Sequence, residues 1–136
     1  KQIIVTVSPI RHLKDGAHQN NLSKALLLLA CEQVEKQWDN VSYFPSYEIM
    51  MDELRDYRFY ADDMVHPSPL AVQYIWQRFS ETFFSETTQK ACADRLKITQ
   101  MQQHRPSNTQ SEAYKQLQEK IAHQLETWKE KYMRAK

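Results

Sequence analysis

A β-branched run at the start of the chain, Ile3 to Val7, places the strongest constraint on the fold, and it ends at Ser8 and Pro9. Uninterrupted residues of this kind are typical of a strand buried on both faces of a parallel sheet. A second, short strand is predicted at Val41 to Phe44. Parallel strands need a crossover of a dozen or more residues between them, so the sequence predicts a βαβ unit and an α/β fold.

The segment between these strands divides into a polar part and an apolar part. Ile10 to Asn21 is predicted to be a loop at the carboxyl end of the first strand, which is the end where open α/β sheets bind ligands. Asn21 can cap a helix that runs to about Trp38. The apolar stripe of this helix is predicted to consist of Leu22, Ala25, Leu26, Leu29, Ala30 and Val34.

The remainder of the chain favours helices. Ser46 is predicted to cap a short helix that ends near Leu54, with Ile49, Met50 and Leu54 as its apolar face. Arg55 to Pro67 is predicted to be a loop, and Ser68 with Pro69 to begin a further helix.

Two more helices are expected beyond Phe84, on either side of a break at Arg105 to Asn108. The first runs from Ser85 to about His104. The last is long and amphipathic, with an apolar face of Tyr114, Leu117, Ile121, Leu125, Trp128 and Tyr132. We therefore predict an α/β domain at residues 1–84 and a helical extension at 85–136 that packs on it.

Composition excludes several classes of protein. The 18 basic and 17 acidic residues leave a net charge of +1, too weak a field to gather nucleic acid or an anionic membrane. Gly16 is the only glycine, so nucleotide-binding loops are excluded. Cys31 and Cys92 lie in apolar-periodic segments and suggest neither a disulfide framework nor a metal site. No cofactor is expected.

Apolar runs are short, the longest being Ala25 to Cys31, so no membrane span is predicted. No export signal is visible either, which favours a soluble cytoplasmic location over an exported one. Two parallel strands alone leave unpaired edges. We therefore expect a missing N-terminal half of the same protein to supply further strands, and self-association through uncovered apolar surface where it does not.

The segment Asp63 to Ser68 carries the candidate chemistry. A carboxylate three residues before a histidine on a tight loop can accept the imidazole Nδ1–H, which leaves Nε2 free as a general base. Asp63 and His66 have this spacing, and Asp62, four residues before His66, is the second choice. The alternative interpretation of Asp63 and His66 is a helix-capping acid with a surface histidine nearby and no catalytic role.

Several blocks of the sequence resemble the GSCFA-domain family, whose members are mostly bacterial. The blocks cover most of the chain: Thr6 to His12 with Lys14 to Gly16, Asn20 to Ala25, Tyr43 to Glu48, Asp63 to Ser68 with Tyr74 to Trp76, and Arg105 to Asn108 ahead of Ser111 to Tyr114.

That family is similar to SGNH/GDSL hydrolases, which have a flavodoxin-like α/β fold and cleave acyl esters with a serine nucleophile. The resemblance implies that this chain is the C-terminal part of such a fold, in which Asp63 orients His66 and His66 activates the serine. The Gly-Ser-Cys-Phe-Ala motif that would hold the nucleophile is absent from the sequence. The chain alone is therefore expected to be inactive.

Other polar and aromatic residues have two interpretations each. Arg11 and His12, and less clearly His18, either contact the substrate or its oxyanion or only bond within their loop. His104 and His123 are expected at the surface, away from any metal. The aromatic residues could line an acyl pocket, but core packing is the commoner role.

Two functions remain open at the level of sequence. The first is a serine-type hydrolase that acts on a small acyl ester, such as an O-acylated carbohydrate. The second is a non-catalytic module whose helices after Ser68 bind a partner or oligomerise, with a purely structural Asp63–His66 pair.

Overall fold

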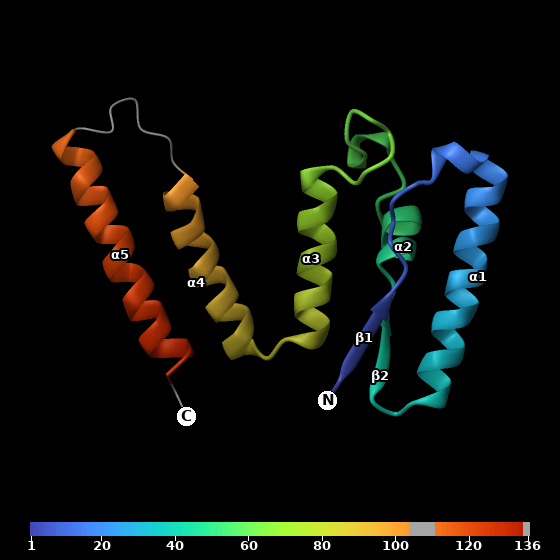
Figure 1. Ribbon diagram of the computed structural model, residues 1–136, viewed down its shortest axis with the longest axis horizontal. Coiled ribbons are helices and arrows are strands. Elements are labelled where there is room, and N and C mark those ends of the chain that lie inside the picture. Colours follow the sequence, from blue (N-terminus) through green and yellow to red (C-terminus); the bar gives the residue numbers. More distant parts are fainter. Residues whose placement is uncertain (104–110, 135–136) are drawn as a thin grey trace. The chain divides into compact units, whose positions relative to one another are not determined.

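The structure is a computed structural model that describes residues 1–103 and 111–134. It divides into two compact units, Lys1–Ser80 and Glu81–Lys136. The main elements, shown in Figure 1, are β1 (Ile3–Thr6), α1 (Gly16–Gln37), β2 (Val41–Phe44), α2 (Ser46–Glu48), α3 (Pro69–Phe83), α4 (Glu86–Gln103) and α5 (Glu112–Tyr132). Short 3₁₀ turns occur at Leu13–Asp15 and Tyr57–Phe59, and a π-helical turn at Ile49–Glu53 continues α2.

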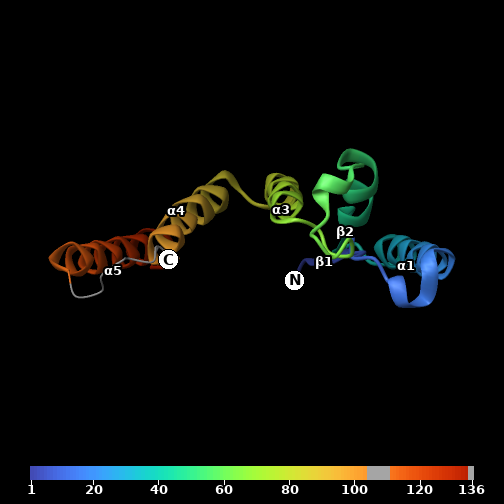
Figure 2. The ribbon, with the colours of Figure 1, turned by 90° about the horizontal axis from the view of Figure 1, so that it is seen from above.

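The first unit is built on a parallel pair of strands. β1 and β2 pair in register from Ile3 opposite Val41 to Thr6 opposite Phe44, and α1 is the crossover between them. Seen from above in Figure 2, α1 lies on one side of the strand pair and α3 on the other. The predicted βαβ unit and the α/β fold with a helical extension are confirmed.

β1 is exposed, although its sequence predicted a strand buried on both faces. The strand ends at Thr6, and Ile3 and Ile4 keep 49% and 37% of their surface exposed. Val7, just beyond it, is buried. The prediction was wrong because a β-branched sequence shows what a strand can bury and not which elements cover it, and the sheet of the described residues has only two strands.

α1 begins at Gly16, five residues before the predicted cap at Asn21. The polar residues at its start were interpreted as a loop, but they are exposed and therefore tolerated in a first helical turn. Gly16 has φ +79°, a conformation that costs little only for a residue without Cβ. The polar loop after β1 is therefore shorter than predicted.

The face of α1 that meets the strands is not the predicted apolar stripe. Leu26 and Leu29 of that stripe are 69% and 62% exposed. The buried and half-buried side instead carries Lys24, Leu28, Cys31 and Glu35, spaced by four, three and four. Polar bonds decide the orientation, because Lys24 Nζ donates to the Ser8 carbonyl at 2.6 Å and Glu35 accepts the Tyr43 N–H at 2.8 Å.

The core of the first unit forms around β2 and the helical segment that follows it. Ile49, Met50 and Leu54 are buried, as predicted. Ser46 is the first residue of α2 and does not cap it; its hydroxyl instead donates to the Val7 carbonyl at 2.8 Å.

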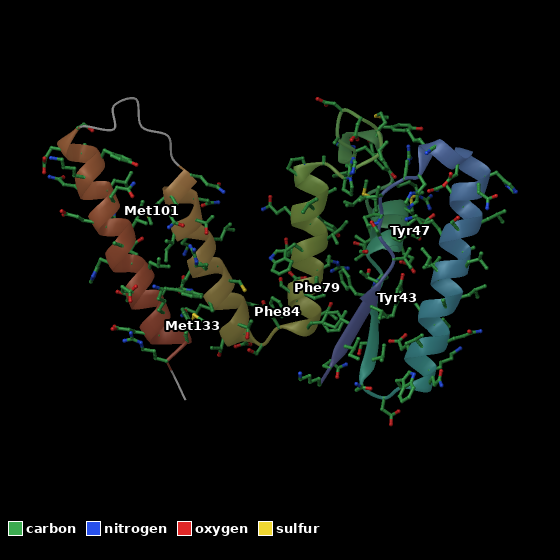
Figure 3. The ribbon with its side chains drawn as sticks, in the orientation of Figure 1. Tyr43, Tyr47, Phe79, Phe84, Met101 and Met133 are labelled. Carbon is green, nitrogen blue, oxygen red and sulfur yellow. The ribbon has the colours of Figure 1, made fainter. Side chains whose placement is uncertain are left out.

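α3 contributes a ring to this core and begins where the sequence predicted. The Phe79 ring, labelled in Figure 3, meets the Phe44 ring edge-on with centroids 5.1 Å apart. α3 begins at Pro69, and Ser68 Oγ accepts the Ala71 N–H.

The second unit contains an antiparallel pair of helices, α4 and α5. Trp128 Nε1 donates to the Ala91 carbonyl at 2.9 Å, and the Tyr132 hydroxyl donates to Asp94 at 2.8 Å. Ile98 and Ile121 are the buried residues of the two helices. Ser111 caps α5 by accepting the Tyr114 N–H. The predicted break at Arg105 to Asn108 lies outside the described residues.

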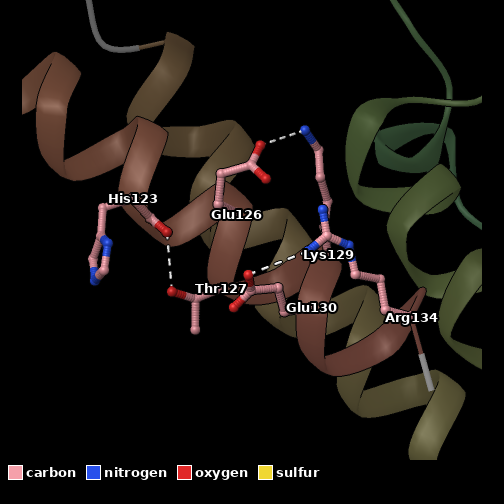
Figure 4. Close-up of polar contacts among 6 residues, drawn as sticks. All are labelled: His123, Glu126, Thr127, Lys129, Glu130 and Arg134. Carbon is pink, nitrogen blue, oxygen red and sulfur yellow. Dashed lines mark hydrogen bonds and ion pairs between the residues drawn. The ribbon is translucent and has the colours of Figure 1, made fainter.

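One face of α5 is charged. Lys129 pairs with Glu126 and Arg134 with Glu130, at one-turn spacings (Figure 4). On the same helix, the Thr127 hydroxyl donates to the backbone carbonyl of His123 at 3.0 Å. No helix in residues 1–103 or 111–134 is long and apolar enough to cross a membrane.

The neighbouring methionines Met50 and Met51 provide a matched test of this core. Met50 is 1% exposed and Met51 is 37% exposed. We predict that Met50→Ala lowers the free energy of unfolding by about 2–5 kcal/mol, because it leaves a cavity. Met51→Ala should cost well under half as much. Denaturant titration followed by circular dichroism measures both, and equal losses would contradict the packing described.

Candidate active site

The Asp63–His66 segment forms a tight turn closed by backbone hydrogen bonds. The Ala61 N–H donates to the His66 carbonyl at 2.7 Å, and the Met64 N–H donates to the Ala61 carbonyl at 2.9 Å. Tyr60 and Pro67 pair as an isolated antiparallel bridge beside the turn. Met64 has φ +59°, a left-handed conformation that is uncommon outside glycine and often marks a functional turn.

The Asp63 carboxylate organises this turn. One oxygen, Oδ1, accepts the N–H groups of Val65 at 2.9 Å and His66 at 3.0 Å. The other oxygen, Oδ2, lies 2.6 Å from His66 Nδ1. A single carboxylate therefore shapes the backbone and fixes the imidazole. No hydrogen bond joins Asp62 to His66 in the described residues, so Asp63 is the acid that orients the ring.

These bonds favour the charged form of Asp63. They lower its pKa from 3.8 to about 2, first through the His66 N–H, then through the Val65 N–H, and then through the imidazole. An ionised carboxylate can only accept a hydrogen bond, so His66 Nδ1 carries the proton at neutral pH.

The far side of the His66 ring is open. No described residue hydrogen-bonds to Nε2, and the His66 side chain keeps 56% of its surface exposed. Nε2 therefore has its lone pair available to a group that approaches from solvent. This is the arrangement that a general base needs.

The loop after β1 meets this turn. The Arg11 N–H donates to the Val65 carbonyl at 3.2 Å, directly before His66. The two segments therefore come together beyond the end of β1.

Arg11 and His12 occupy different environments within that loop. The Arg11 guanidinium lies over the Tyr60 ring, 4.0 Å from its centroid, and 5.7 Å from that of Tyr57. This cation–π stacking holds Arg11 against the segment that leads into the turn. The His12 N–H donates to Asn20 Oδ1 at 2.9 Å, and the residue is exposed. A substrate-binding role for either residue remains a prediction.

A part-buried polar network joins the ends of the two strands. The Thr6 hydroxyl lies 2.7 Å from the Ser46 hydroxyl and donates to the Phe44 carbonyl at 2.6 Å. Lys24, only 2% exposed, holds the Ser8 carbonyl, and burial lowers the pKa of its ammonium group.

Sequence reasoning missed Lys24, Tyr57 and Tyr60 as contributors to the site. Lys24 had a usable signal, because it shares a helical face with Leu28 and Glu35. Tyr57 and Tyr60 lie in an irregular segment. Because its sequence has no helical or strand period, it does not predict where their side chains point. The aromatic residues divide between core and surface, since Phe44 is 5% exposed and Tyr57 is 66% exposed.

The remaining candidate residues form no second site. His18 is exposed in α1, and His104 lies outside the described residues. Cys31 and Cys92 are unpaired and half-buried. Within residues 1–103 and 111–134, no three His, Cys, Asp or Glu side chains gather in a way that could hold a metal ion.

Comparison with protein families gives two matches. A model of the GSCFA family matches residues 1–79. The chain belongs to the GSCFA family. A second model, described as the GSCFA domain protein C-terminal domain, matches residues 96–136. No curated protein and no solved structure matches the chain.

The two matches correspond to different parts of this GSCFA chain. The first covers the strand pair, the loop with Arg11 and the turn with Asp63 and His66. The second covers the end of α4 and all of α5. The family resemblance of the sequence is therefore confirmed over both regions, and neither match assigns a reaction to the turn.

The carboxylate of Asp63 gives a prediction on pH. Because its folded pKa of about 2 lies below the ordinary 3.8, its contribution to stability is complete above about pH 4 and is lost as the pH falls through about 2. Carbon-detected NMR titration of the Asp63 carboxyl should give a midpoint near 2, and Asp62→Asn should leave that midpoint unchanged. A midpoint near 3.8 would mean that the three hydrogen bonds to Asp63 do not persist in solution.

Proposed function

We propose that this GSCFA chain supplies the acid and the base of a serine-type acyl hydrolase. The observation that carries the proposal is the 2.6 Å contact between Asp63 Oδ2 and His66 Nδ1, combined with an unoccupied Nε2. The contact fixes the tautomer that a general base requires, and the exposure of the ring gives a nucleophile access to it.

In the proposed reaction, a serine hydroxyl attacks the carbonyl carbon of the ester. Nε2 of His66 takes the hydroxyl proton as the new C–O bond forms, and Asp63 stabilises the resulting imidazolium. The imidazolium then returns the proton to the departing alcohol, which leaves an acyl-enzyme. Water attacks that acyl group with His66 again as the base, and the acid is released while the serine recovers its proton.

The serine would come from polypeptide outside residues 1–136. In the described residues no serine hydroxyl is bonded to Nε2, and the Gly-Ser-Cys-Phe-Ala motif is absent from the sequence. The N-terminal half of the parent protein is the proposed source. This chain alone would then supply the acid and the base but would not hydrolyse an ester.

The loop with Arg11 and His12 is the proposed contact for the substrate. Its backbone touches the turn at Val65, and the exposed His12 side chain is free to meet a small acyl ester such as an O-acylated carbohydrate. Arg11 is better placed to hold the loop, because its guanidinium is engaged by Tyr60. We assign the substrate contact to His12 first.

The alternative is a non-catalytic partner-binding module formed by the helices after Ser68. An open hollow between α4 and α5, with Ile98, Met101, Leu117 and Trp128 among its lining residues, is the observation in its favour. The charged pairs of α5, Lys129 with Glu126 and Arg134 with Glu130, lie outside the lining of this hollow (Figure 4). If the Asp63–His66 pair were only structural, the exposed Nε2 of His66 would have no role.

The test uses the full-length parent protein with short-chain aryl esters and acetylated sugars. His66→Ala should lower kcat/KM by about 10²–10⁴-fold, because the attacking hydroxyl loses its base. Asp63→Asn should lower kcat/KM by less or comparably, since it removes only the group that orients the ring. His123→Ala is the control and should keep wild-type activity, while circular dichroism checks folding. Wild-type turnover by His66→Ala would exclude His66 as the base.

A further inference from the structure

The guanidinium of Arg11 differs from those of the other arginines in residues 1–103 and 111–134. Each of the others donates to a side-chain oxygen at 3.0–3.5 Å; they are Arg55, Arg58, Arg78, Arg95 and Arg134. The Arg11 guanidinium makes no hydrogen bond or ion pair with any described residue, and only its backbone N–H donates, to the Val65 carbonyl. Within the described residues, its charge therefore has no acceptor.

Two tyrosines hold the Arg11 guanidinium by its flat face. It lies 4.0 Å from the Tyr60 ring centroid and 5.7 Å from that of Tyr57. Stacking uses the face of a guanidinium, whereas its five N–H groups point outward in the plane. Arg11 is half-buried, and no buried side-chain nitrogen in the described residues lacks a partner, so these unbonded donors reach solvent. The face of the group is held and its edge is open.

This arrangement prepares Arg11 for a ligand. A long, mobile arginine side chain loses conformational freedom when it binds, and that loss weakens the binding. The rings of Tyr57 and Tyr60 already restrict the guanidinium in the folded chain. A ligand that bonds to the open edge therefore gains the charged hydrogen bonds without ordering the side chain first.

The acids near Arg11 leave its charge uncompensated. Asp56 pairs with Arg58 at 3.1 Å. Asp63 accepts the two backbone N–H groups of its own turn and contacts the His66 ring. Asp62 makes no hydrogen bond to Arg11 in the described residues. The position next to the turn thus offers a positive edge that no described carboxylate occupies.

We propose that the open edge of Arg11 binds a carboxylate carried by the ester substrate, which makes acidic esters the preferred substrate class. The proposal rests on the proposed function, because it needs His66 as the base beside this edge. The Arg11 N–H bonds to the carbonyl of Val65, the residue directly before His66, so one backbone bond brings the two groups together. His12 keeps its proposed contact with the ester group, and Arg11 meets a second group of the same molecule.

The shape and charge of the Arg11 edge favour a carboxylate over other anions. The two oxygens of a carboxylate lie in one plane at the spacing of two parallel guanidinium N–H groups, so both bonds form together. A phosphate dianion carries more charge than one guanidinium neutralises. The cations Lys24 and Arg58 are already engaged, by the Ser8 carbonyl and by Asp56. A single unpaired cation matches a single negative charge.

The first experiment measures binding in the 136-residue chain and needs no activity. The probes are monomethyl succinate, which carries a carboxylate and an ester, and dimethyl succinate, which carries no carboxylate. NMR follows the Nε–Hε resonance of each arginine. We expect monomethyl succinate to shift the Arg11 resonance in a saturable way, and dimethyl succinate to leave it in place. Arg58, which already has an acid partner, is the internal control and should not move.

The second experiment measures selectivity in the full-length parent protein. One arm compares an aryl hemisuccinate with an aryl butyrate, and the other compares an acetylated uronic acid with an acetylated neutral sugar. The arms show whether the carboxylate belongs to the acyl half or to the alcohol half of the substrate. In one arm, Arg11→Gln should lower the acidic-to-neutral ratio of kcat/KM by about tenfold or more, chiefly through KM.

Two further variants separate the shape of Arg11 from its charge. Arg11→Lys keeps the charge but loses the planar fork, so it should recover only part of the selectivity. Arg58→Gln removes the same charge from the neighbouring turn and should keep the wild-type ratio. Because each ratio is taken within one variant, a general loss of activity from a displaced loop cancels out.

Four results would overturn the proposal. They are a carboxylate that moves Arg58 as far as Arg11, tighter binding of inorganic phosphate than of monomethyl succinate at equal ionic strength, and an unchanged selectivity ratio in Arg11→Gln. The fourth is a shift of the Arg11 resonance in ligand-free Asp62→Asn, because Asp62 would then already occupy the edge. A parent protein that hydrolyses no ester while Arg11 binds the carboxylate would instead count against the proposed function alone.

Discussion

The parallel pairing of β1 with β2 is the constraint on which the first unit depends. Parallel strands cannot be joined by a tight turn, so α1 must cross over, and both strands end at the same side of the sheet. The segments after Thr6 and Phe44 therefore start side by side. Ser46 and Thr6 tie the two strand ends together through their hydroxyls, and Lys24 holds the Ser8 carbonyl. The loop with Arg11 then reaches the turn from a fixed origin.

The turn itself depends on one charge. The Asp63 carboxylate satisfies two backbone donors and the imidazole together, so any change that removes the charge loosens the backbone and releases the ring at once. The Asp63 side chain is half exposed to water, and this affects how strongly it can stabilise a charged His66 ring. A solvated carboxylate interacts less strongly with an imidazolium than a buried one does. A partner chain that covers the turn would strengthen the interaction by excluding water from it.

Sequence reasoning succeeded where local signals are short and failed where burial depends on neighbours. The Asp63–His66 pair was found because a spacing of three on a tight loop permits the contact and because this segment resembles the GSCFA family. Ser68 with Pro69 marked the start of α3 correctly. The exposure of Ile3 and Ile4 could not be predicted, since β-branched composition reports what a strand can bury and not what stands beside it. The same holds for α1, because several of its leucines find no cover and stay exposed. The side that it turns to the strands is the one with the polar bonds of Lys24 and Glu35. The position of Arg11 over Tyr60 could not be predicted either, because it depends on the path of an irregular segment.

Asp63 holds His66 in the tautomer with Nε2 free, and ring ¹⁵N chemical shifts measure that tautomer directly. At a pH where the imidazole is neutral, we expect a protonated Nδ1 and an unprotonated Nε2 in the wild-type chain. Asp63→Asn should shift the ring toward a mixture of tautomers. A wild-type spectrum with the proton on Nε2, or one that Asp63→Asn leaves unchanged, would mean that Asp63 does not hold the His66 ring.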